Sequence, residues 1–293
     1  MQTAFPRSYL FVPGNRPERF GKACSAGADA VIIDLEDAVP PAQKRAARAA
    51  VAAWLSPERS ALIRINGEDT EWFQEDVELC RAPGVAGIVF PKAERIGDFL
   101  LAACIPDSRP LLPLVETAEG FSNLNVLAGT RGVQRFLFGS IDFQLDLGID
   151  GDNEELLYFR SRIVLVSRIA GLLPPVDGVS TVIDDLRQVR AETLRSRRLG
   201  FGGKLCIHPK QVTVVNECFT PGPEEVAWAR RVLEAAAAAQ GAAASVDGKM
   251  VDRPVMLKAE RIVSKAERRA LERHATTPDV PSKGNPNRQN PVN

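Results

Sequence analysis

Short apolar runs recur along the chain and alternate with longer stretches whose apolar residues fall three or four positions apart. A short apolar run between turn-forming residues is typical of a buried strand, and the three-to-four spacing is typical of an amphipathic helix. The sequence predicts strands at residues 9–14, 30–37, 61–67, 87–92, 110–117, 136–143, 174–180 and 203–209. It predicts helices between them, the clearest at residues 41–55, 70–82, 94–104, 155–172 and 184–200.

The strands begin roughly 20 to 40 residues apart, which is the spacing of repeated strand–helix units. Strands that read as continuous apolar runs indicate a parallel sheet covered on both faces. Eight even units favour closure into a (β/α)8 TIM barrel of the α/β class, a fold that takes about 250 residues. An open doubly wound sheet is the alternative.

The pattern changes after the eighth unit. An alanine-rich helical stretch after residue 222 is followed by a short strand or turn and by another helix. We therefore expect a barrel domain at residues 1–240 and a C-terminal helical extension at residues 241–274. Residues 275–293 are rich in Pro and Asn with little to bury, so we expect a disordered tail there.

Polar residues follow nearly all the predicted strands, at the rim from which barrels present their catalytic groups. They are Asp34, Glu36, Asp37, Arg64, Asn66, Lys92, Glu94, Glu116, Asp142 and His208. Because Glu116 and Asp142 follow adjacent strands, their carboxylates can converge, and two convergent carboxylates repel unless a cation or proton lies between them. The pair predicts a Mg²⁺ site. In the alternative, each forms a structural ion pair with a nearby Lys or Arg.

Arg64 follows an apolar run that carries it to the same rim. Its planar guanidinium suits a carboxylate or enolate oxygen, so we expect it to bind substrate. The alternative is a salt bridge to Asp34, Glu36 or Asp37. Lys92, His208 and Arg16 are weaker candidates for binding substrate. Lys92 can instead pair with Glu94, and His208 can be a packed residue. Arg16 lies beside a common turn sequence.

Composition narrows the chemistry. The 37 basic and 37 acidic residues cancel, so net charge gives no argument for a nucleic acid or an acidic membrane as partner. No apolar run approaches a membrane span of about 20 residues, and no signal sequence is recognisable, so we expect a cytoplasmic protein. Two histidines cannot build a His-rich zinc site, which leaves oxygen ligands and favours Mg²⁺ or Mn²⁺. Five cysteines without a CxxC pair predict free thiols.

Several of these segments together resemble the citrate lyase beta subunit-like family of the HpcH/HpaI aldolase superfamily. They occur in the family's order and are RSYLFVPGNRPERF, VIIDLEDAV, RING, GIVFPKAE, LVETAEG, FGSIDFQLDLG, GFGGKLCIHPKQ and PGPEEVAWARRVLEA. The resemblance implies a TIM barrel, Mg²⁺ and reversible carbon–carbon cleavage of a 3-hydroxyacyl thioester. FGSIDF departs from the family's more usual wording of the sixth strand, although it keeps Asp142.

The resemblance also implies roles for individual residues. Glu116 and Asp142 match the family's metal carboxylates, Arg64 its substrate-binding arginine, and Asp37 an acidic residue near the waters on the metal. GKMVDRP (248–254) resembles the C-terminal extension of the malyl-CoA and citramalyl-CoA lyase branch, in which an aspartate enters a neighbouring subunit's active site. Asp252 matches that aspartate. The alternative is that Asp252 caps the last helix.

The resemblance therefore implies a magnesium-dependent lyase that cleaves a CoA thioester of the malyl or citramalyl type into acetyl-CoA, or a similar product, and a 2-oxo acid. We expect a homo-oligomer, a trimer or hexamer, with Asp252 of one chain completing the next site. Two alternatives stay open. One is a citrate lyase beta subunit that acts on a carrier-bound citryl thioester, and the other is a thioesterase on malyl-CoA-like substrates.

Overall fold

The computed structural model describes residues 5–94, 109–239 and 244–276. Residues 95–104 of the expected helix, with Cys104 among them, and all but the first two residues of the expected tail lie outside these ranges. The chain divides into two compact units, one of residues Phe5–Phe219 and one that begins at Thr220, and each is described by itself.

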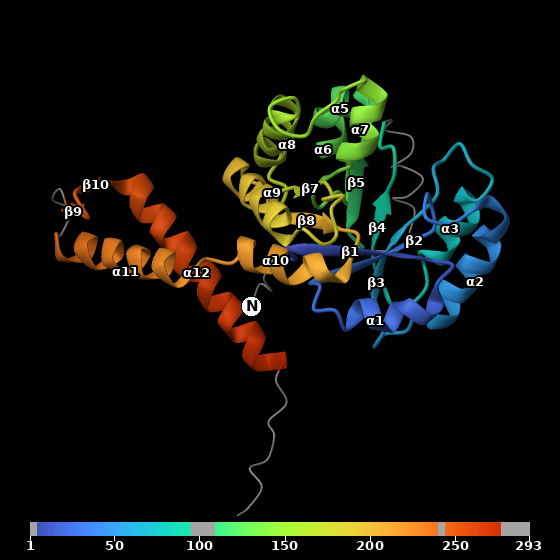
Figure 1. The fold of residues 1–293 in the computed structure, drawn as a ribbon, viewed down its shortest axis with the longest axis horizontal. Coiled ribbons are helices and arrows are strands. Elements are labelled where there is room, and N and C mark those ends of the chain that lie inside the picture. Colours follow the sequence, from blue (N-terminus) through green and yellow to red (C-terminus); the bar gives the residue numbers. More distant parts are fainter. Residues whose placement is uncertain (1–4, 95–108, 240–243, 277–293) are drawn as a thin grey trace, which may run out of the picture. The chain divides into compact units, whose positions relative to one another are not determined.

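The first unit is a closed barrel of eight parallel strands, in which each strand pairs with the next along the chain (Figure 1). The eighth strand pairs back onto the first, with Tyr9 opposite Leu205, and this contact closes the barrel. The strands are β1 (Ser8–Pro13), β2 (Ala30–Asp34), β3 (Ala61–Arg64), β4 (Val85–Phe90), β5 (Leu111–Val115), β6 (Leu137–Phe138), β7 (Val176–Asp177) and β8 (Gly203–Cys206).

Alternate residues of the strands divide the apolar side chains into two clusters. The inner cluster takes residues from all eight strands and fills the barrel: Tyr9, Ile32, Leu62, Val89, Leu112, Leu114, Leu137, Val176 and Leu205. The strand residues between them, such as Leu10, Ile33 and Ile63, belong to a larger cluster with the helices. Because successive side chains of a strand point to opposite faces, every second residue of a strand faces the barrel interior.

Helices cover the outside of the barrel. The first unit has η1 (Pro17–Arg19), α1 (Phe20–Cys24), η2 (Pro41–Gln43), α2 (Lys44–Trp54), α3 (Phe73–Leu79), α5 (Ala118–Ser122), α6 (Leu124–Ala128), α7 (Ser140–Leu147), α8 (Leu157–Ile169), α9 (Leu186–Leu199) and α10 (Pro209–Phe219). Helix α9 shows why they form where they do. Its N-cap Asp185 accepts hydrogen bonds from the amides of Arg187 and Gln188, and Gly200 ends it at φ 103°.

The predicted strand at residues 136–143 is only partly a strand. Leu137 and Phe138 form β6, whereas Ser140 already begins α7. Within α7 the buried residues are Ser140 and Phe143, three positions apart as a helix requires, and Ile141 is exposed. Asp142 therefore lies in the first turn of a helix, where the partial positive charge of the helix terminus favours a carboxylate.

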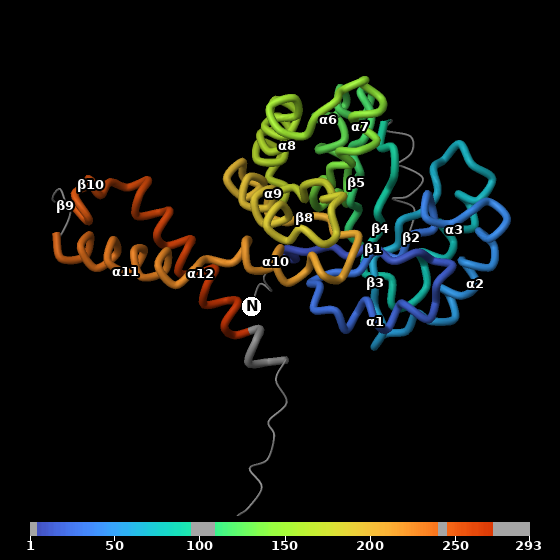
Figure 2. Tube along the Cα trace, in the orientation of Figure 1, coloured from blue at the N-terminus to red at the C-terminus, as the bar shows by residue number. Residues whose placement is uncertain are grey.

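The second unit is built from two helices and a small hairpin. Helix α11 (Pro223–Ala238) packs against α12 (Arg253–Thr276), with Ala229, Val232 and Ile262 among the buried contacts (Figure 2). The hairpin joins β9 (Ala244–Val246) to β10 (Lys249–Val251). This unit begins about 20 residues before the expected boundary at 241, because the apolar face of α11 is buried against α12.

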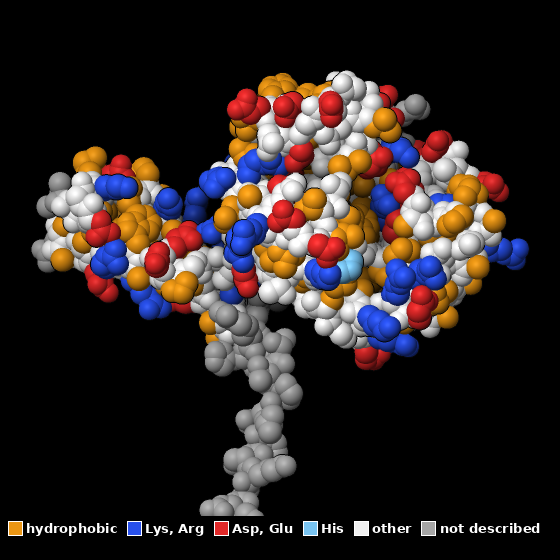
Figure 3. Space-filling view, in the orientation of Figure 1, with side chains coloured by type: hydrophobic (Ala, Val, Ile, Leu, Met, Phe, Trp, Pro, Cys, Tyr) orange, Lys and Arg blue, Asp and Glu red, His pale blue; other side chains and the backbone are white. Residues whose placement is uncertain are grey.

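Charged side chains of both signs are interspersed over the face of the protein drawn in Figure 3. This distribution agrees with the formal net charge of zero. None of the helices in the described ranges has the length and hydropathy needed to cross a membrane.

A buried ionic cluster connects β7 to the helices outside the barrel. The carboxylate of Asp177 is fully buried and accepts hydrogen bonds from Arg160 Nε at 2.9 Å and from the Ser196 hydroxyl. Burial alone would raise the pKa of Asp177. The charges of Lys204 and Arg160, together with these hydrogen bonds, outweigh burial and lower the pKa below its ordinary value.

We expect Asp177→Asn to lower the free energy of unfolding by about 3–5 kcal/mol, because it leaves the guanidinium of Arg160 buried without its main counter-charge. Urea denaturation at several pH values measures this. The folded pKa is depressed, so the contribution is full above the unfolded pKa of about 3.9 and disappears as pH falls through the folded pKa. The exposed Asp184→Asn is the control and should change little. Equal stability of Asp177→Asn and wild type at neutral pH would contradict this assignment.

Candidate active site

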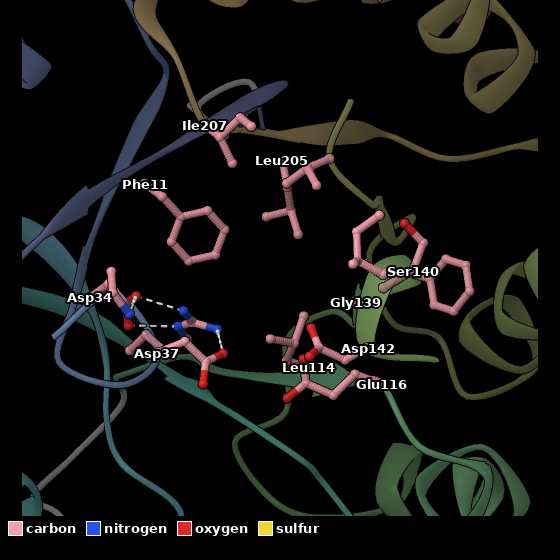
Figure 4. Close-up of a pocket in the computed structure, with 15 residues that line it drawn as sticks. Phe11, Asp34, Asp37, Leu114, Glu116, Gly139, Ser140, Asp142, Leu205 and Ile207 are labelled. Atoms are coloured by element: carbon pink, nitrogen blue, oxygen red, sulfur yellow. Dashed lines mark hydrogen bonds and ion pairs between the residues drawn. The ribbon is translucent and has the colours of Figure 1, made fainter. Parts of the chain in front are cut away.

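The alternation that fills the barrel continues beyond the apolar layer into its carboxyl-terminal mouth. Asp34, Arg64 and Glu116 each lie two positions after an inward-facing residue of the same strand, namely Ile32, Leu62 and Leu114. All three side chains therefore face inward, and they line a cavity of about 360 Å³ (Figure 4). Another part of its wall is apolar and consists of Phe11 of β1, Leu205 of β8 and Ile207, which follows β8.

Arg64 is held by several acidic side chains. Its Nε and Nη2 bind the two oxygens of Asp34 at 2.7 and 2.5 Å, and its Nη1 lies 2.9 Å from Glu36 Oε2. Asp37 is the most distant of these partners, at 3.4 Å, and its side chain is 57% exposed. The salt-bridge alternative for Arg64 is therefore present in the structure, although the residue also lines the cavity.

Two further features fix the guanidinium of Arg64. The Phe11 ring lies with its centroid 5.0 Å from the guanidinium carbon, a cation–π distance. Burial alone would lower the pKa of Arg64, but the charge and hydrogen bonds of Asp34 raise it above its ordinary value. Arg64 is therefore a permanent cation whose plane is set before any ligand enters.

The Glu116 carboxylate is buried, at 2% exposure, and only one of its two oxygens has a hydrogen-bond partner among the described residues. Its Oε1 accepts a hydrogen bond of 2.7 Å from the backbone amide of Lys92, which is presented by a left-handed conformation at φ 43°. Its Oε2 has no hydrogen-bond partner among the residues that the structure describes. Burial, followed by the charge of Glu36, raises the pKa of Glu116 to about 8, and Asp142 adds to the rise.

Gly139 allows this arrangement. A Cβ atom at Gly139 would lie 2.6 Å from Glu116 Oε2, closer than side chains tolerate. The missing side chain leaves room for the carboxylate and for whatever binds its unpaired oxygen.

Asp142 reaches the same part of the cavity from the first turn of α7. Figure 4 shows its carboxyl group beside that of Glu116. In the described residues, no further His, Cys, Asp or Glu joins the pair to make a group of three metal ligands. A buried, unpaired carboxylate oxygen beside a second carboxylate fits a hard divalent cation that takes one or two protein carboxylates and completes its coordination with water or substrate oxygens.

The charge of the cavity wall also favours a bound cation. Among the lining residues described, four carboxylates face one guanidinium, and that guanidinium is already engaged by acidic partners. The carboxylates are Asp34, Asp37, Glu116 and Asp142. An anionic substrate would be repelled by this wall unless a divalent cation bound with it.

The other predicted substrate-binding residues lie outside the described cavity wall. Lys92 contributes its backbone amide to Glu116, while its ammonium group lies 3.2 Å from Glu36, a different acid from the alternative partner Glu94. Arg16 is exposed and lies 3.9 Å from Glu18. His208 accepts a hydrogen bond from the amide of Lys210, and the preceding residue, Ile207, lines the cavity instead.

Asp252 belongs to the second unit and caps α12. Its Oδ1 accepts a hydrogen bond of 3.1 Å from the amide of Val255. The capping alternative for Asp252 is therefore seen in the structure, and the residue is also exposed.

The sequence pattern places Asp34 and Glu36 at the rim and offers them as alternative partners of Arg64, but it does not single out Phe11. The structure places Asp34 and Phe11 in the cavity wall and Glu36 between Arg64 and Lys92. The two-residue period of β1 and β2, counted from Tyr9 and Ile32, could have identified Phe11 and Asp34 as inward-facing.

Residues 7–209 match the family model described as HpcH/HpaI aldolase/citrate lyase. A citrate lyase subunit beta-like protein of Deinococcus radiodurans is 36% identical over 280 residues, which cover 89% of this chain and 97% of that protein. This chain belongs to the HpcH/HpaI aldolase/citrate lyase family. The expected family is thus confirmed, and so is the expectation of an enzyme of the lyase class.

Two other proteins are similar to this chain over most of their length. A (3S)-malyl-CoA thioesterase of Cereibacter sphaeroides is 35% identical over 271 residues, which cover 89% of this chain and 94% of that protein. A crystal structure of CitE from Mycobacterium tuberculosis, in complex with magnesium, acetoacetate and coenzyme A, has 35% identity and a TM-score of 0.80, and the match covers 91% of this chain and 100% of that chain. The predicted (β/α)8 barrel is confirmed.

The unpaired oxygen of Glu116 gives a prediction for the protein stripped of divalent cations. At neutral pH, Glu116→Gln should raise its thermal midpoint by roughly 4–8 °C, equivalent to about 2 kcal/mol, because a neutral amide does not have to take up a proton on folding, as a carboxyl whose pKa is raised to about 8 must. Differential scanning calorimetry in EDTA measures this. Asp142→Asn, at a less buried position, should give a smaller change, and a lower midpoint for Glu116→Gln would show that the carboxylate is satisfied as it stands.

Proposed function

We propose that this protein is a magnesium-dependent carbon–carbon lyase that cleaves a 3-hydroxyacyl-CoA thioester of the malyl or citramalyl type into acetyl-CoA, or a similar thioester, and a 2-oxo acid. The observation that carries the proposal is the unpaired, buried oxygen of Glu116 beside Asp142, in a cavity that also holds the guanidinium of Arg64. The magnesium, acetoacetate and coenzyme A in the similar CitE structure support it.

Glu116 and Asp142 would hold the divalent cation, Mg²⁺ or Mn²⁺, through their carboxylate oxygens. Bound there, the cation would supply Lewis-acid chemistry, which lowers the pKa of the substrate hydroxyl and offsets the charge of the substrate carboxylate. The Lys92 amide holds one oxygen of Glu116, so the other oxygen is kept in place for the cation. Gly139 leaves space for it.

Arg64 would bind the oxygen on which negative charge develops when the carbon–carbon bond breaks and an enolate forms. Asp34 and Phe11 fix its plane beforehand, so little reorganisation is needed during the reaction. A preorganised donor of this kind contributes about 3 kcal/mol to transition-state stabilisation. Asp37 is the most exposed and the most distant of its acidic partners, so it is the one that a substrate oxygen can displace. It would then accept, through water beside the cation, the proton that leaves the substrate hydroxyl as the carbon–carbon bond breaks.

Asp252 would exchange the proton at the enolate carbon: it donates the proton during cleavage and removes it in the reverse direction. We propose that it acts in the site of a neighbouring subunit of a homotrimer or hexamer, and that residues 241–274 carry it there as an extension of the barrel domain. Exposure of Asp252 at the start of α12 is compatible with that role. The remaining substrate-binding candidates Arg16, Lys92 and His208 would contact the CoA thioester from the rim.

We also propose a cytoplasmic location with no nucleic acid or membrane partner. The four cysteines in the described residues, Cys24, Cys80, Cys206 and Cys218, are free thiols, as expected in a reducing compartment.

A thioesterase is the second candidate function, and the similarity to a (3S)-malyl-CoA thioesterase favours it. Hydrolysis would use the same cation and arginine but would leave the hydroxy acid intact. A citrate lyase beta subunit acting on a carrier-bound citryl thioester fits the cavity less well. A citryl group carries an additional carboxylate, and the described wall offers it no cation beyond the engaged Arg64.

A panel of malyl-, methylmalyl- and citramalyl-CoA with Mg²⁺ separates these functions by their products. We expect a 2-oxo acid with the purified protein alone, loss of turnover in EDTA, and a fall of more than 100-fold in Glu116→Ala and Asp142→Ala with the fold retained. The free hydroxy acid as sole product would identify the thioesterase. Full turnover in EDTA would refute the proposal.

Subunit mixing tests the shared site. Asp252→Ala should keep the affinity for Mn²⁺, measured by electron paramagnetic resonance, because Glu116 and Asp142 are unchanged, while turnover falls steeply. Mixed with inactive Glu116→Ala chains, it should regain part of the activity, since a hybrid interface can hold one intact site. A mixture that stays inactive after proven subunit exchange would leave Asp252 with its capping role alone.

A further inference from the structure

A buried cation outside the cavity wall has no part in the chemistry described above. Lys44, the first residue of α2, is 6% exposed. Its ammonium group donates to the backbone carbonyls of Leu35 and Glu36 at 2.8 and 2.7 Å and to the side-chain oxygen of Asn66 at 2.6 Å. An ammonium group has three donors, so all of its hydrogen-bonding capacity is used at these contacts.

The segment that Lys44 holds carries the acidic partners of Arg64. Glu36 and Asp37 follow β2 and direct their carboxylates to Arg64 Nη1. The carboxylate of Asp34 accepts hydrogen bonds from the amides of Glu36 and Ala38 at 2.8 and 3.1 Å, which bind the same segment from the cavity side. Residues 34–38 are thus fixed from within by Asp34 and from behind by Lys44.

The other contact of Lys44 connects this segment to the end of β3. Asn66 lies two residues after Arg64, and both its backbone and side-chain amides bind Asp76 of α3. Burial lowers the pKa of Lys44, and the charges of Asp34, Glu36 and Asp76 act against that shift. Lys44 is the group that joins α2, the segment after β2 and the end of β3 at one point.

We infer that Lys44 is a positioning residue, which sets the partners of Arg64 by holding Glu36 and Asp37 against its Nη1 nitrogen. The inference rests on the proposed function only in that Arg64 is taken as the substrate-binding group. Without the ammonium group, two carbonyls and the Asn66 oxygen lose their shared donor, and the segment can withdraw. Asp34 still holds Nε and Nη2, so the guanidinium stays in place while Nη1 loses its acidic partners.

Arg48 provides a matched control. It lies one helical turn after Lys44 on α2 and is also buried. Its Nε donates to Asp76 at 2.6 Å, and Asp76 is the residue of α3 that binds Asn66. The remaining contacts of Arg48 are to Glu75 and to the carbonyl of Trp72. Replacing either Lys44 or Arg48 by Met removes a buried cation from the same face of α2. Of the two, only Lys44 contacts the segment that carries Glu36 and Asp37.

The first measurement is nuclear magnetic resonance of the arginine side-chain nitrogens, with Arg64→Lys identifying the Arg64 signals. Wild type should show separate, slowly rotating Nη1 hydrogens together with a hydrogen-bonded Nε hydrogen. Lys44→Met should broaden the Nη1 signals and leave the Nε signal at Asp34 unchanged. Arg48→Met should preserve both, and Lys44→Arg should restore Nη1. If either Met variant fails to fold, Lys44→Gln and Arg48→Gln give the same comparison.

The second measurement is turnover with the CoA ester that wild type cleaves. Lys44→Met should lower kcat about 10- to 100-fold, because Glu36 no longer holds Nη1 in the orientation at which a substrate oxygen displaces Asp37. Arg48→Met should keep kcat at an equal loss of stability. Unchanged Nη1 signals in Lys44→Met, a mobile Nη1 in wild type, or equal losses of signal and kcat in both Met variants would each overturn the inference. If wild type cleaves none of the esters, the proposed function fails, and the resonance comparison still decides the role of Lys44.

Discussion

The constraint on which the site depends is the closure of eight parallel strands with alternate side chains directed inward. Closure between β8 and β1 leaves no edge, so the orientation of each strand is fixed by its neighbours on both sides. A residue two positions beyond the apolar filling then enters the mouth of the barrel. Asp34, Arg64 and Glu116 come together for this reason, although 30 and 52 residues separate them along the chain.

The electrostatics of the mouth follow from how many acidic groups this geometry gathers. Most of the acidic groups are balanced inside the protein: Arg64 and Lys92 engage Glu36, and Arg64 binds Asp34. Glu116 is not balanced in this way: burial and its acidic neighbours raise its pKa, and one of its oxygens stays unpaired among the described residues. A buried, unpaired carboxylate oxygen of this kind lowers the stability of the metal-free protein and therefore favours the binding of a divalent cation.

The regular alternation of predicted strands and helices was enough to predict the barrel, because the spacing of hydrophobic residues shows which face of each element is buried. The short β6 was harder. The apolar residues between 137 and 143 have the pattern of a strand. A helix begins directly after Gly139, however, and Ile141 is exposed on it. Strand-end positions correctly indicated that Arg64, Glu116 and Asp142 gather at one rim. They could not show which acids surround Arg64, because that depends on the path of residues 34–38 and on the contact with Lys44.

For Asp252 the sequence left two roles open. The structure shows the cap, and a role in another subunit depends on contacts beyond a single chain.

The hairpin before Asp252 has a consequence for association. Asp247 and Gly248 have φ values of 52° and 73°, the pair of left-handed conformations that a two-residue type I′ turn requires, and they join β9 to β10 directly ahead of the cap. Asp252 is therefore carried on a folded element whose backbone is ordered within its own unit. In the proposed homo-oligomer, the neighbouring surface would not have to order a flexible segment to receive this carboxylate, so the entropic cost that usually weakens the binding of disordered segments would already be met during folding.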